Sequence, residues 1–333
     1  FKQERVITCL DGWFIVKEIY ENTMEELADT PHVIRTATAL KEVLKKLPIY
    51  INENNVFAGT QRDAFARSYA LINPNFSVST FNGYCDPTAV FDDIDVDGTY
   101  TKERIEKVRE QSGRGKYVSA LAKVYEEVKD DTEEVAYFIE QVTGHLIPDM
   151  RPALRNGLNS LISEIEKRLE KEEDEKKREQ YTAMKITLES TLILAARYRE
   201  CALCMADKAE GRRKEQFSYM AKTLSKVPAE GAENLYEAIQ SFLLLWQVMC
   251  IEQAPNPFAF SVGNADRIFE PYRAAENADR DYAAGLFKHF LAFFNVGDRS
   301  WAISQNVLLG GRDVSGNDLT NLTSYALLDA YYA

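Results

Sequence analysis

The sequence has 333 residues, of which 45% are hydrophobic and 28% are charged, the balance of an ordinary globular protein. Its net charge is −12 and it has no block of basic residues, which argues against nucleic acid or an anionic membrane as a partner. The five scattered cysteines predict no disulfide framework and fit a reducing cytoplasm. We find no signal peptide, and no apolar run reaches the roughly 20 residues that span a bilayer.

The first hundred residues predict helices followed by an irregular segment. Residues 1–30 predict helical segments, and apolar residues at helical spacing predict a helix over 31–47 that ends at Pro48. Residues 49–51 and 56–58 predict two short strands or extended segments around an Asn-rich turn. Residues 60–101 show poor periodicity, so we interpret them as a long irregular segment packed on the surface.

The middle of the chain predicts mostly helix over residues 102–250. A polar helix over 102–111 is followed by a helical run that reaches about residue 143. Gly144 and Pro148 break the helical pattern at 144–149. After this break we expect one helix over 152–178 with a solvated, densely charged tail, and a third long helix over 181–209.

The stretch 226–262 predicts a buried helix that leads into a buried strand. Pro228 suits a first helical turn, and residues 242–251 are apolar almost all the way round, as in a helix surrounded by other elements. The apolar run 258–262 predicts a strand that stops at Gly263-Asn264. In α/β folds, ligands bind at such strand ends.

The last part predicts a helix over 281–294 and a buried strand over 301–309 that ends at Gly310-Gly311. A turn at 313–318 then precedes a helix over 319–332. No composition shift marks a domain boundary, so we treat 1–333 as one unit.

Two cysteines at 201 and 204 form a Cys-x-x-Cys motif inside a predicted helix. A zinc site needs four ligands and no second pair accompanies them, while a redox pair favours a helix start that follows a strand. We therefore interpret Cys201 and Cys204 as residues that pack in the core.

Several motifs, in order along the chain, are shared with one family. They are R-T-A-T-A-L-K-E-V-L and Y-I-N-E-N-N-V-F-A-G within 35–59, G-H-L-I-P-D at 144–149, R-N-G-L at 155–158, A-A-R-Y at 195–198, V-P-A at 227–229, E-A-I-Q at 237–240 and L-L-G-G-R-D-V-S-G-N-D-L-T-N-L-T-S-Y at 308–325. Together they resemble the N-terminal half of glycyl radical enzymes of the pyruvate formate-lyase type.

The resemblance implies an α/β fold: the helix-rich N-terminal half of a ten-stranded barrel, built from two antiparallel-related halves and incomplete in this chain. It also implies radical chemistry, in which a glycyl radical takes a hydrogen atom from a cysteine thiol and the thiyl radical attacks a small molecule. A closed cavity lined by strands shelters such a radical from water and oxygen.

The chain departs from the family pattern at the reactive residues. It has no R-V-x-G-Y motif for the radical glycine, and its one match to the cysteine motif, Cys250-Ile251-Glu252, lies in the buried helix, where we read Cys250 as structural. We therefore expect no catalytic residue and no bound cofactor in this chain, with the glycyl radical in a missing C-terminal part. The isolated chain is expected to be inactive, and the reaction stays open among C–C, C–O and C–N cleavage by a lyase, dehydratase or decarboxylase, with formate acetyltransferase-like chemistry also open.

The resemblance also suggests which residues face the substrate. His145 and Ser261 match the two family segments that contribute pocket residues, and Tyr137 lies eight residues before His145, on the same face of a continuous helix. The pKa of a histidine near neutrality suits proton transfer to a leaving hydroxyl. Trp301, Gln305 and Asn306 complete the substrate-binding prediction, and no metal site is predicted.

The implied partners are a small-molecule substrate, a radical S-adenosylmethionine activating enzyme and a second copy in a homodimer, in the cytoplasm. An alternative from another class is a short, non-catalytic homologue that binds a small molecule or a partner chain. A third reading, a purely helical scaffold, predicts no strand within 256–262 or 303–309.

Overall fold

The computed structural model describes residues 11–47, 49–59, 123, 126–128, 130, 146–252, 261–294 and 306–333. Two short strands, β1 (Gly263–Asn264) and β2 (Val307–Leu308), pair in parallel, with Gly263 opposite Val307 and Asn264 opposite Leu308. The helices of this part of the chain are α1 (Asp11–Glu26), α2 (His32–Lys46), α7 (Arg151–Leu169), α8 (Glu175–Lys208), α9 (Gly211–Leu224), α10 (Leu235–Glu252), α11 (Ala265–Ala275), α12 (Arg280–Phe294) and α13 (Leu322–Tyr332).

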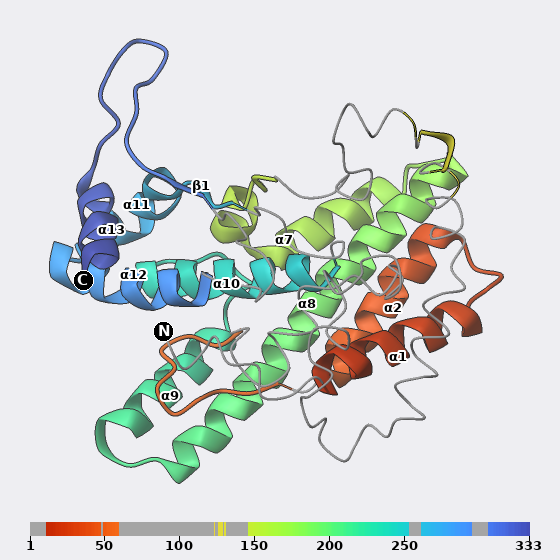
Figure 1. The fold of residues 1–333 in the computed structure, drawn as a ribbon, viewed down its shortest axis with the longest axis horizontal. Helices are drawn as coiled ribbons and strands as arrows, with labels where there is room; N and C mark the ends of the chain where they lie inside the picture. Colours follow the sequence, from red (N-terminus) through yellow and green to blue (C-terminus); the bar gives the residue numbers. More distant parts are fainter. Residues whose placement is uncertain are drawn as a thin grey trace.

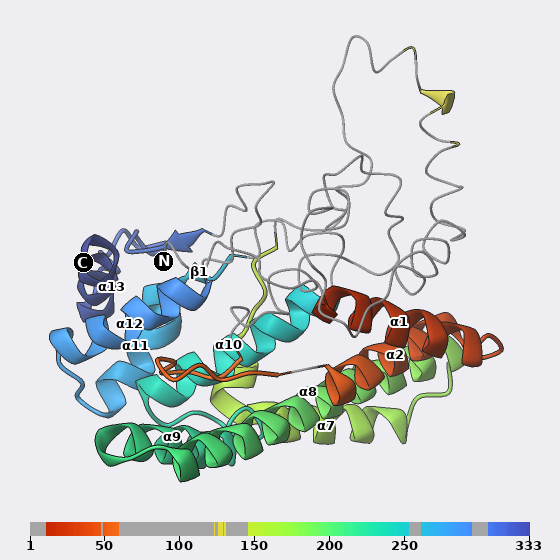
Figure 2. The ribbon, with the colours of Figure 1, turned by 60° about the horizontal axis from the view of Figure 1, so that its bottom comes forward.

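The long helix α8 organises one side of the molecule. It packs mainly against α2 and α9, with α7 alongside, and its buried positions are mostly small residues, which let neighbouring helices approach closely. Helices α11, α12 and α13 form a second group at the other end of α10, next to β1 (Figures 1 and 2). Helix α10 therefore connects the two groups.

The predicted core helix is confirmed as α10, whose described side chains are almost all buried. Phe242 lies edge-on to Phe269 and Phe290, with ring centroids 5.7 and 5.6 Å away, and Trp246 contacts Phe294 at 4.7 Å. Aromatic pairs in this geometry stabilise a core beyond the area that they bury. The middle of α10, the middle of α11 and the C-terminal part of α12 thus share one aromatic cluster.

The start of α10 differs from the prediction at Pro228. The helix begins at Leu235, because the Asn234 side chain accepts a hydrogen bond from the Glu237 N–H at 2.9 Å and caps the first turn. Pro228 lies in a preceding turn after a cis peptide bond.

The single helix predicted over 152–178 is wrong. Helix α7 ends at Leu169, and α8 begins at Glu175 after a turn in which Asp174 accepts a hydrogen bond from the Lys177 N–H at 3.0 Å. Asp174 caps α8 by satisfying one of its N-terminal amides. In the sequence this aspartate stands among many other charged residues, so it was not identified as a cap.

A glycine divides α7 into two pieces that cross another backbone segment. Gly157 has φ of +74°, and a Cβ there would lie 2.4 Å from the Ala229 carbonyl oxygen. The N–H of Leu158 donates to Pro228 O at 2.8 Å, and the N–H of Ala232 donates to Leu154 O at 2.8 Å. The R-N-G-L and V-P-A motifs are therefore two sides of one close backbone contact.

The strands predicted around the Asn-rich turn are absent from 49–51 and 56–58, where the backbone is irregular. The side chains of Asn52 and Asn55 accept hydrogen bonds from nearby amides, at 2.8 Å from the Asn52 N–H to Asn55 and 3.0 Å from the Asn54 N–H to Asn52. These local bonds compete with strand pairing.

Helix α11 was not predicted, although it follows β1 directly. The expected strand at 258–262 also shifts, since residues 261–262 are irregular and β1 begins at Gly263; residues 253–260 lie outside the described part. Strand β2 confirms a strand within 301–309, but Leu308 is 47% exposed, so the described part of that strand is not buried as expected. Its presence rules out the purely helical scaffold.

Other predictions are confirmed closely: α2 matches 31–47, α8 matches 181–209 apart from its earlier start, and α12 matches 281–294. Helix α1 agrees with helical segments within 1–30, and α13 starts three residues later than expected. Predictions for Pro48, 60–101, 102–111 and most of 113–143 fall outside the described residues.

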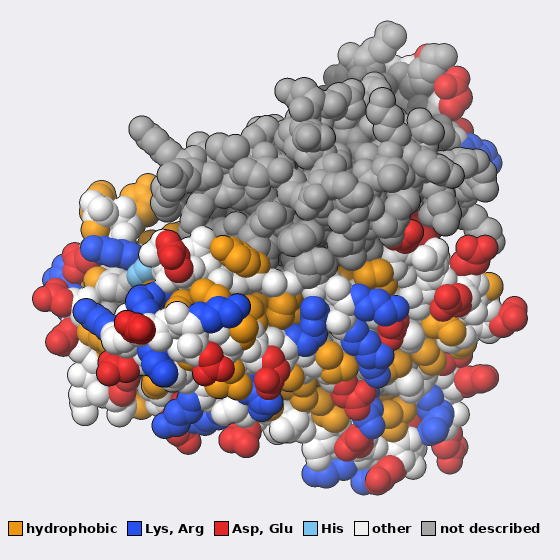
Figure 3. Space-filling view, turned by 90° about the horizontal axis from the view of Figure 1, so that it is seen from below, with side chains coloured by type: hydrophobic (Ala, Val, Ile, Leu, Met, Phe, Trp, Pro, Cys, Tyr) orange, Lys and Arg blue, Asp and Glu red, His pale blue; other side chains and the backbone are white. Residues whose placement is uncertain are grey.

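The loop between β2 and α13 contains the predicted turn and projects from the body of the molecule (Figure 1). Arg312 and Asp318 form an isolated antiparallel bridge, and the Asp313 carboxylate accepts from the N–H groups of Ser315 and Asn317 at 2.8 and 2.9 Å. On the face shown in Figure 3, acidic and basic side chains are interspersed. Among the described helices, we find none that combines the length and the hydropathy needed to cross a bilayer.

Candidate active site at the ends of the paired strands

Three segments that are far apart in sequence meet beside β1. The Ser261 N–H donates to the Leu146 carbonyl at 2.9 Å, and the Val262 N–H donates to the Asn306 carbonyl at 3.2 Å. The Asn306 N–H in turn donates to the Ser261 hydroxyl oxygen at 2.9 Å. The structure thus brings Ser261 and Asn306, two of the predicted substrate-binding residues, into direct contact.

Ser261 is only 4% exposed, so its hydroxyl helps to hold this junction together. Asn306 uses its backbone N–H and carbonyl in the junction and remains exposed as a residue. His145 and Gln305 precede Leu146 and Asn306 directly in sequence but lie outside the described residues, as do Tyr137 and Trp301. Their proposed roles stay predictions.

Gly263 allows the segment that follows His145 to pass close to β1. It has φ of +80°, and a Cβ there would lie 2.7 Å from Ile147 Cγ2. Both the positive φ and the close approach favour glycine. Because β1 begins at this glycine, the contact places residues 146–147 against the start of the strand.

A buried carboxylate that the sequence reasoning missed lies directly after β1. Asp266 is fully buried and accepts hydrogen bonds from the Gly310 N–H and the Ser324 hydroxyl, both at 2.5 Å. The next residue, Arg267, donates from its guanidinium to the Gly310 carbonyl at 2.7 Å. A negative charge near the N-terminus of a helix is favourable, but no local sequence signal links Asp266 to Gly310.

Helix α11 carries a second carboxylate that anchors α13. Glu270 accepts from the Thr323 hydroxyl at 2.7 Å and from both Nε and Nη2 of Arg273, at 2.8 and 2.7 Å. Burial acts to raise the pKa of Glu270, but the bonds from Arg273 and Thr323 outweigh it and hold that pKa below its ordinary value. At neutral pH, Glu270 therefore links α11 to α13 as a carboxylate.

Other family motifs support the loop 49–59. The Gln240 side chain bonds both the N–H and the carbonyl of Ala58, each at 2.9 Å, and the Tyr236 hydroxyl donates to Val56 O at 2.6 Å. Arg197 donates to the carbonyls of Leu44 and Leu47 at 2.6 and 2.5 Å, closing the end of α2. The A-A-R-Y and E-A-I-Q motifs thus hold main chain, and none of these groups is left free for a ligand.

The expected core packing of the Cys-x-x-Cys pair holds for only one of the two cysteines. Cys201 is partly buried against the core, and burial raises the pKa of its thiol, whereas Cys204 is exposed. The two cysteines are about one helical turn apart on α8, and one of them faces the core while the other faces solvent. In the described part of the chain, no group of three or more His, Cys, Asp or Glu side chains is placed to hold a metal ion.

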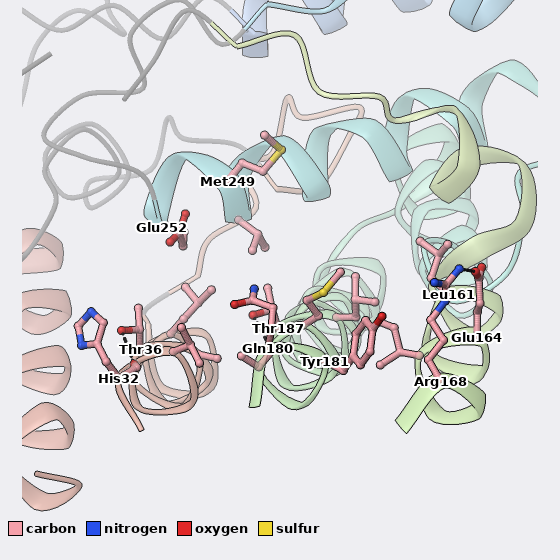
Figure 4. Close-up of a pocket in the computed structure, with 18 residues that line it drawn as sticks. His32, Thr36, Leu161, Glu164, Arg168, Gln180, Tyr181, Thr187, Met249 and Glu252 are labelled. Atoms are coloured by element: carbon pink, nitrogen blue, oxygen red, sulfur yellow. Dashed lines mark hydrogen bonds and ion pairs between the residues drawn. The ribbon is translucent and has the colours of Figure 1, made fainter. Parts of the chain in front are cut away.

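A separate groove of about 730 Å³ lies between α2, α7, α8 and α10, away from the paired strands (Figure 4). Its walls are mostly apolar, with Met249 of α10 above it, His32 towards one end and Arg168 towards the other. Its hydroxyls and charges bond locally, for example Thr187 to the Ala183 carbonyl at 3.0 Å and Arg168 to Glu164 at 2.7 Å. The side chains that line this groove therefore present no convergent set of reactive polar groups.

The family model described as pyruvate formate lyase-like matches residues 2–333. The chain therefore belongs to this family of glycyl radical enzymes, as its motifs suggested. It is similar to the glycyl radical enzyme from Archaeoglobus fulgidus, with a TM-score of 0.81 at 24% identity over 99% of this chain and 45% of that one. It is also similar to the glycerol-bound B12-independent glycerol dehydratase from Clostridium butyricum, with a TM-score of 0.79 at 24% identity over 98% and 46%. These neighbours confirm the expected fold, the helix-rich part of a glycyl radical enzyme barrel.

Curated relatives include the isethionate sulfite-lyase of Desulfovibrio desulfuricans, 26% identical over 93% of this chain and 41% of that protein. The (2S)-3-sulfopropanediol dehydratase of Klebsiella oxytoca is 27% identical over 90% of this chain and 40% of its own length. The chain thus spans about two fifths of the length of these relatives.

Proposed function

We propose that the full-length protein containing this chain is a glycyl radical lyase that eliminates a leaving group from a small polar molecule. Relatives described as dehydratases and as a sulfite-lyase support cleavage of a C–O or C–S bond. Cleavage of a C–S bond was not anticipated from the sequence. The relatives named here favour elimination over the C–C cleavage and acyl transfer that the sequence left open.

One observation carries the proposal most directly: the contact of Ser261 with Asn306 at the paired strands, in a chain that the family matches from residue 2 to 333. Ser261 and Asn306 lie directly before β1 and β2, where the backbone segments around residues 146, 261 and 306 converge. The junction joins three such segments, and each carries or adjoins a predicted substrate-binding residue. This arrangement suits one wall of a substrate pocket.

In this proposal, the chain's own residues bind and orient the substrate. Ser261 and Asn306 hold together the segments that form one wall of the pocket. Contacts to the substrate come from Tyr137, Trp301 and Gln305. His145 delivers a proton to the leaving group. The radical cysteine and glycine, which supply hydrogen-atom abstraction, are proposed to lie in the part of the protein that this chain does not cover.

The partners follow from the same proposal. A radical S-adenosylmethionine enzyme generates the glycyl radical, the protein forms a homodimer, and it acts in the cytoplasm under anaerobic conditions. The isolated chain is inactive because it binds without abstracting a hydrogen atom.

The test is anaerobic activation of the full-length protein with its activating enzyme, followed by electron paramagnetic resonance and turnover assays. The panel is isethionate, (2S)-3-sulfopropanediol, glycerol, 1,2-propanediol and trans-4-hydroxy-L-proline, the compounds named for the relatives. We expect a glycyl radical signal and elimination product from at least one compound. A protein without radical signal and without turnover would refute the proposal in favour of a non-catalytic binding protein.

A further inference from the structure

We propose that Asp266 is a positioning residue for the candidate active site, because its carboxylate fixes the end of β2 against the end of β1. Its catalytic consequence rests on the proposed function; its structural consequence does not. No step of the reaction is assigned to Asp266 itself, which contacts main chain and Ser324 rather than an open pocket.

Gly310 lies two residues after β2, and both of its main-chain polar groups are bonded by residues of α11. The N–H of Gly310 donates to Asp266 at 2.5 Å, and its carbonyl accepts from the Arg267 guanidinium at 2.7 Å. Two neighbouring residues at the start of α11 thus hold both polar groups of one glycine. Since α11 follows β1 directly, this clamp ties the ends of the two strands together.

The strands need such a clamp because their own pairing is short. In the part of the chain that the structure describes, two register pairs join them, Gly263 with Val307 and Asn264 with Leu308. Short, partly exposed strands specify register weakly, and a slip of one residue reverses the direction of every side chain. A slip would also separate the Asn306 N–H from the Ser261 hydroxyl, and so disturb the junction at which the predicted substrate-binding residues meet.

Asparagine cannot replace this carboxylate without conflict. Asp266 accepts from three donors, the N–H of Gly310, the hydroxyl of Ser324 and the N–H of Arg267 at 2.8 Å. The amide of Asp266→Asn has the same shape but carries one N–H₂ group, which would face donors in a fully buried site. The substitution therefore loosens the clamp while changing the volume very little.

Glu270→Gln provides a matched control. It makes the same chemical change on the same helix, one turn later, but Glu270 holds Thr323 of α13 and Arg273 instead of Gly310. Both variants lose a carboxylate near α13, and only Asp266→Asn disturbs the end of β2.

The structural test is hydrogen exchange by mass spectrometry on the full-length protein, read in peptides that cover 261–264 and 306–311. We expect Asp266→Asn to accelerate exchange in both peptides at least tenfold and Glu270→Gln to leave it within about twofold of wild type. Equal acceleration in both variants, or none in Asp266→Asn, overturns the proposal. If Asp266→Asn does not fold, Asp266→Ser, which is smaller and keeps a single oxygen, takes its place in the same comparison, and unchanged exchange at 306–311 overturns the proposal.

The kinetic test compares kcat and KM at equal amounts of folded, activated protein. Displacement of a site by about 1 Å costs as much as 100-fold in rate, so we expect kcat of Asp266→Asn to fall at least tenfold while Glu270→Gln stays within about twofold. Accelerated exchange with unchanged kcat would refute the positioning role. If activated wild-type protein turns over no compound, the proposed function fails, and hydrogen exchange alone decides whether Asp266 fixes the strand ends.

Discussion

The side-chain amide of Gln240 pairs with the main chain of Ala58, 182 residues earlier, by accepting from its N–H and donating to its carbonyl, each at 2.9 Å. Both residues are buried. One side chain of α10 therefore takes the place of a strand neighbour for the loop 49–59.

Gln240→Leu keeps the size of the side chain and removes both bonds. Each buried main-chain group left without a partner costs about 1–3 kcal/mol, so we expect a loss of about 2–5 kcal/mol in the free energy of unfolding. Chemical denaturation of the full-length protein measures it. Gln180→Leu, at an exposed position of α8, is the control and should change stability little. Similar curves for the two variants would contradict the prediction.

Gly157→Ala should prevent the close crossing of α7 and the segment after Pro228. A Cβ at Gly157 would lie 2.4 Å from backbone atoms of Ala229 and Glu230, in a region of φ that L-residues rarely adopt. We expect more than about 4 kcal/mol of destabilisation, or no folded protein. The control is Gly285→Ala in α12, which has open space around it and should gain about 0.5–1 kcal/mol. Thermal unfolding of both variants checks the opposite signs.

Glu270 makes stability depend on pH in acid. Its folded pKa is depressed below the ordinary value of 4.5, so its stabilising contribution is present above that value and is lost as the pH falls through the folded pKa. We expect the stability difference between wild type and Glu270→Gln to be largest near pH 6 and to shrink below pH 4.5. Glu164→Gln, in an exposed ion pair with Arg168, is the control. A difference that stays constant from pH 6 to pH 3 would exclude this linkage.

The two thiols of α8 should differ in reactivity. Cys204 is exposed, whereas burial of Cys201 raises its pKa and lowers the fraction of reactive thiolate. We expect iodoacetamide at pH 8 to modify Cys204 at least tenfold faster, measured by peptide mass spectrometry. A Cys204→Ser variant shows whether labelling of Cys201 is independent of its neighbour. Equal rates in the wild-type protein would show that Cys201 is accessible.

His145→Ala tests the sequence-based assignment of the proton donor. In the activated full-length enzyme we expect kcat to fall by at least 100-fold, the usual range for a positioned acid or base, with little change in melting temperature. His32→Ala, at an exposed position of α2, is the control. A loss of activity that merely follows a loss of folded protein would assign His145 to the core.

Regular, strongly periodic helices were predictable from the sequence. The apolar spacing of Ala37, Leu40 and Leu44 defines α2, and the apolar run 242–251, broken only at Gln247, defines α10, because burial of a continuous face dominates their stability. The helix boundaries were missed where a single polar side chain determines the first residue of the helix. Asp174 and Asn234 start helices by capping one turn, a contribution of about 1 kcal/mol that composition conceals.

The candidate site was predictable only in part, because its geometry depends on long-range contacts. Similarity to the family pointed to Ser261, a place on the last predicted strand pointed to Asn306, and the structure places the two residues together. Nothing local in the sequence reveals that Asp266 reaches Gly310, which lies 44 residues away, since either residue alone resembles an ordinary helix start or turn. Likewise, Gly157 is an unremarkable helix glycine until the backbone of Ala229 is placed against it.

Helix α8 runs for 34 residues without interruption, about 50 Å at 1.5 Å per residue, with α2 along it and α9 folded back onto it. Inserting one residue in the middle of α8 would rotate one half of the helix relative to the other by about 100°. The packing contacts of α2 and α9 with α8 could then not both be kept. Length variation among homologues should therefore accumulate in the turns at 170–174 and 209–210. The constant length of α8 then provides a fixed reference for aligning insertions elsewhere in the chain.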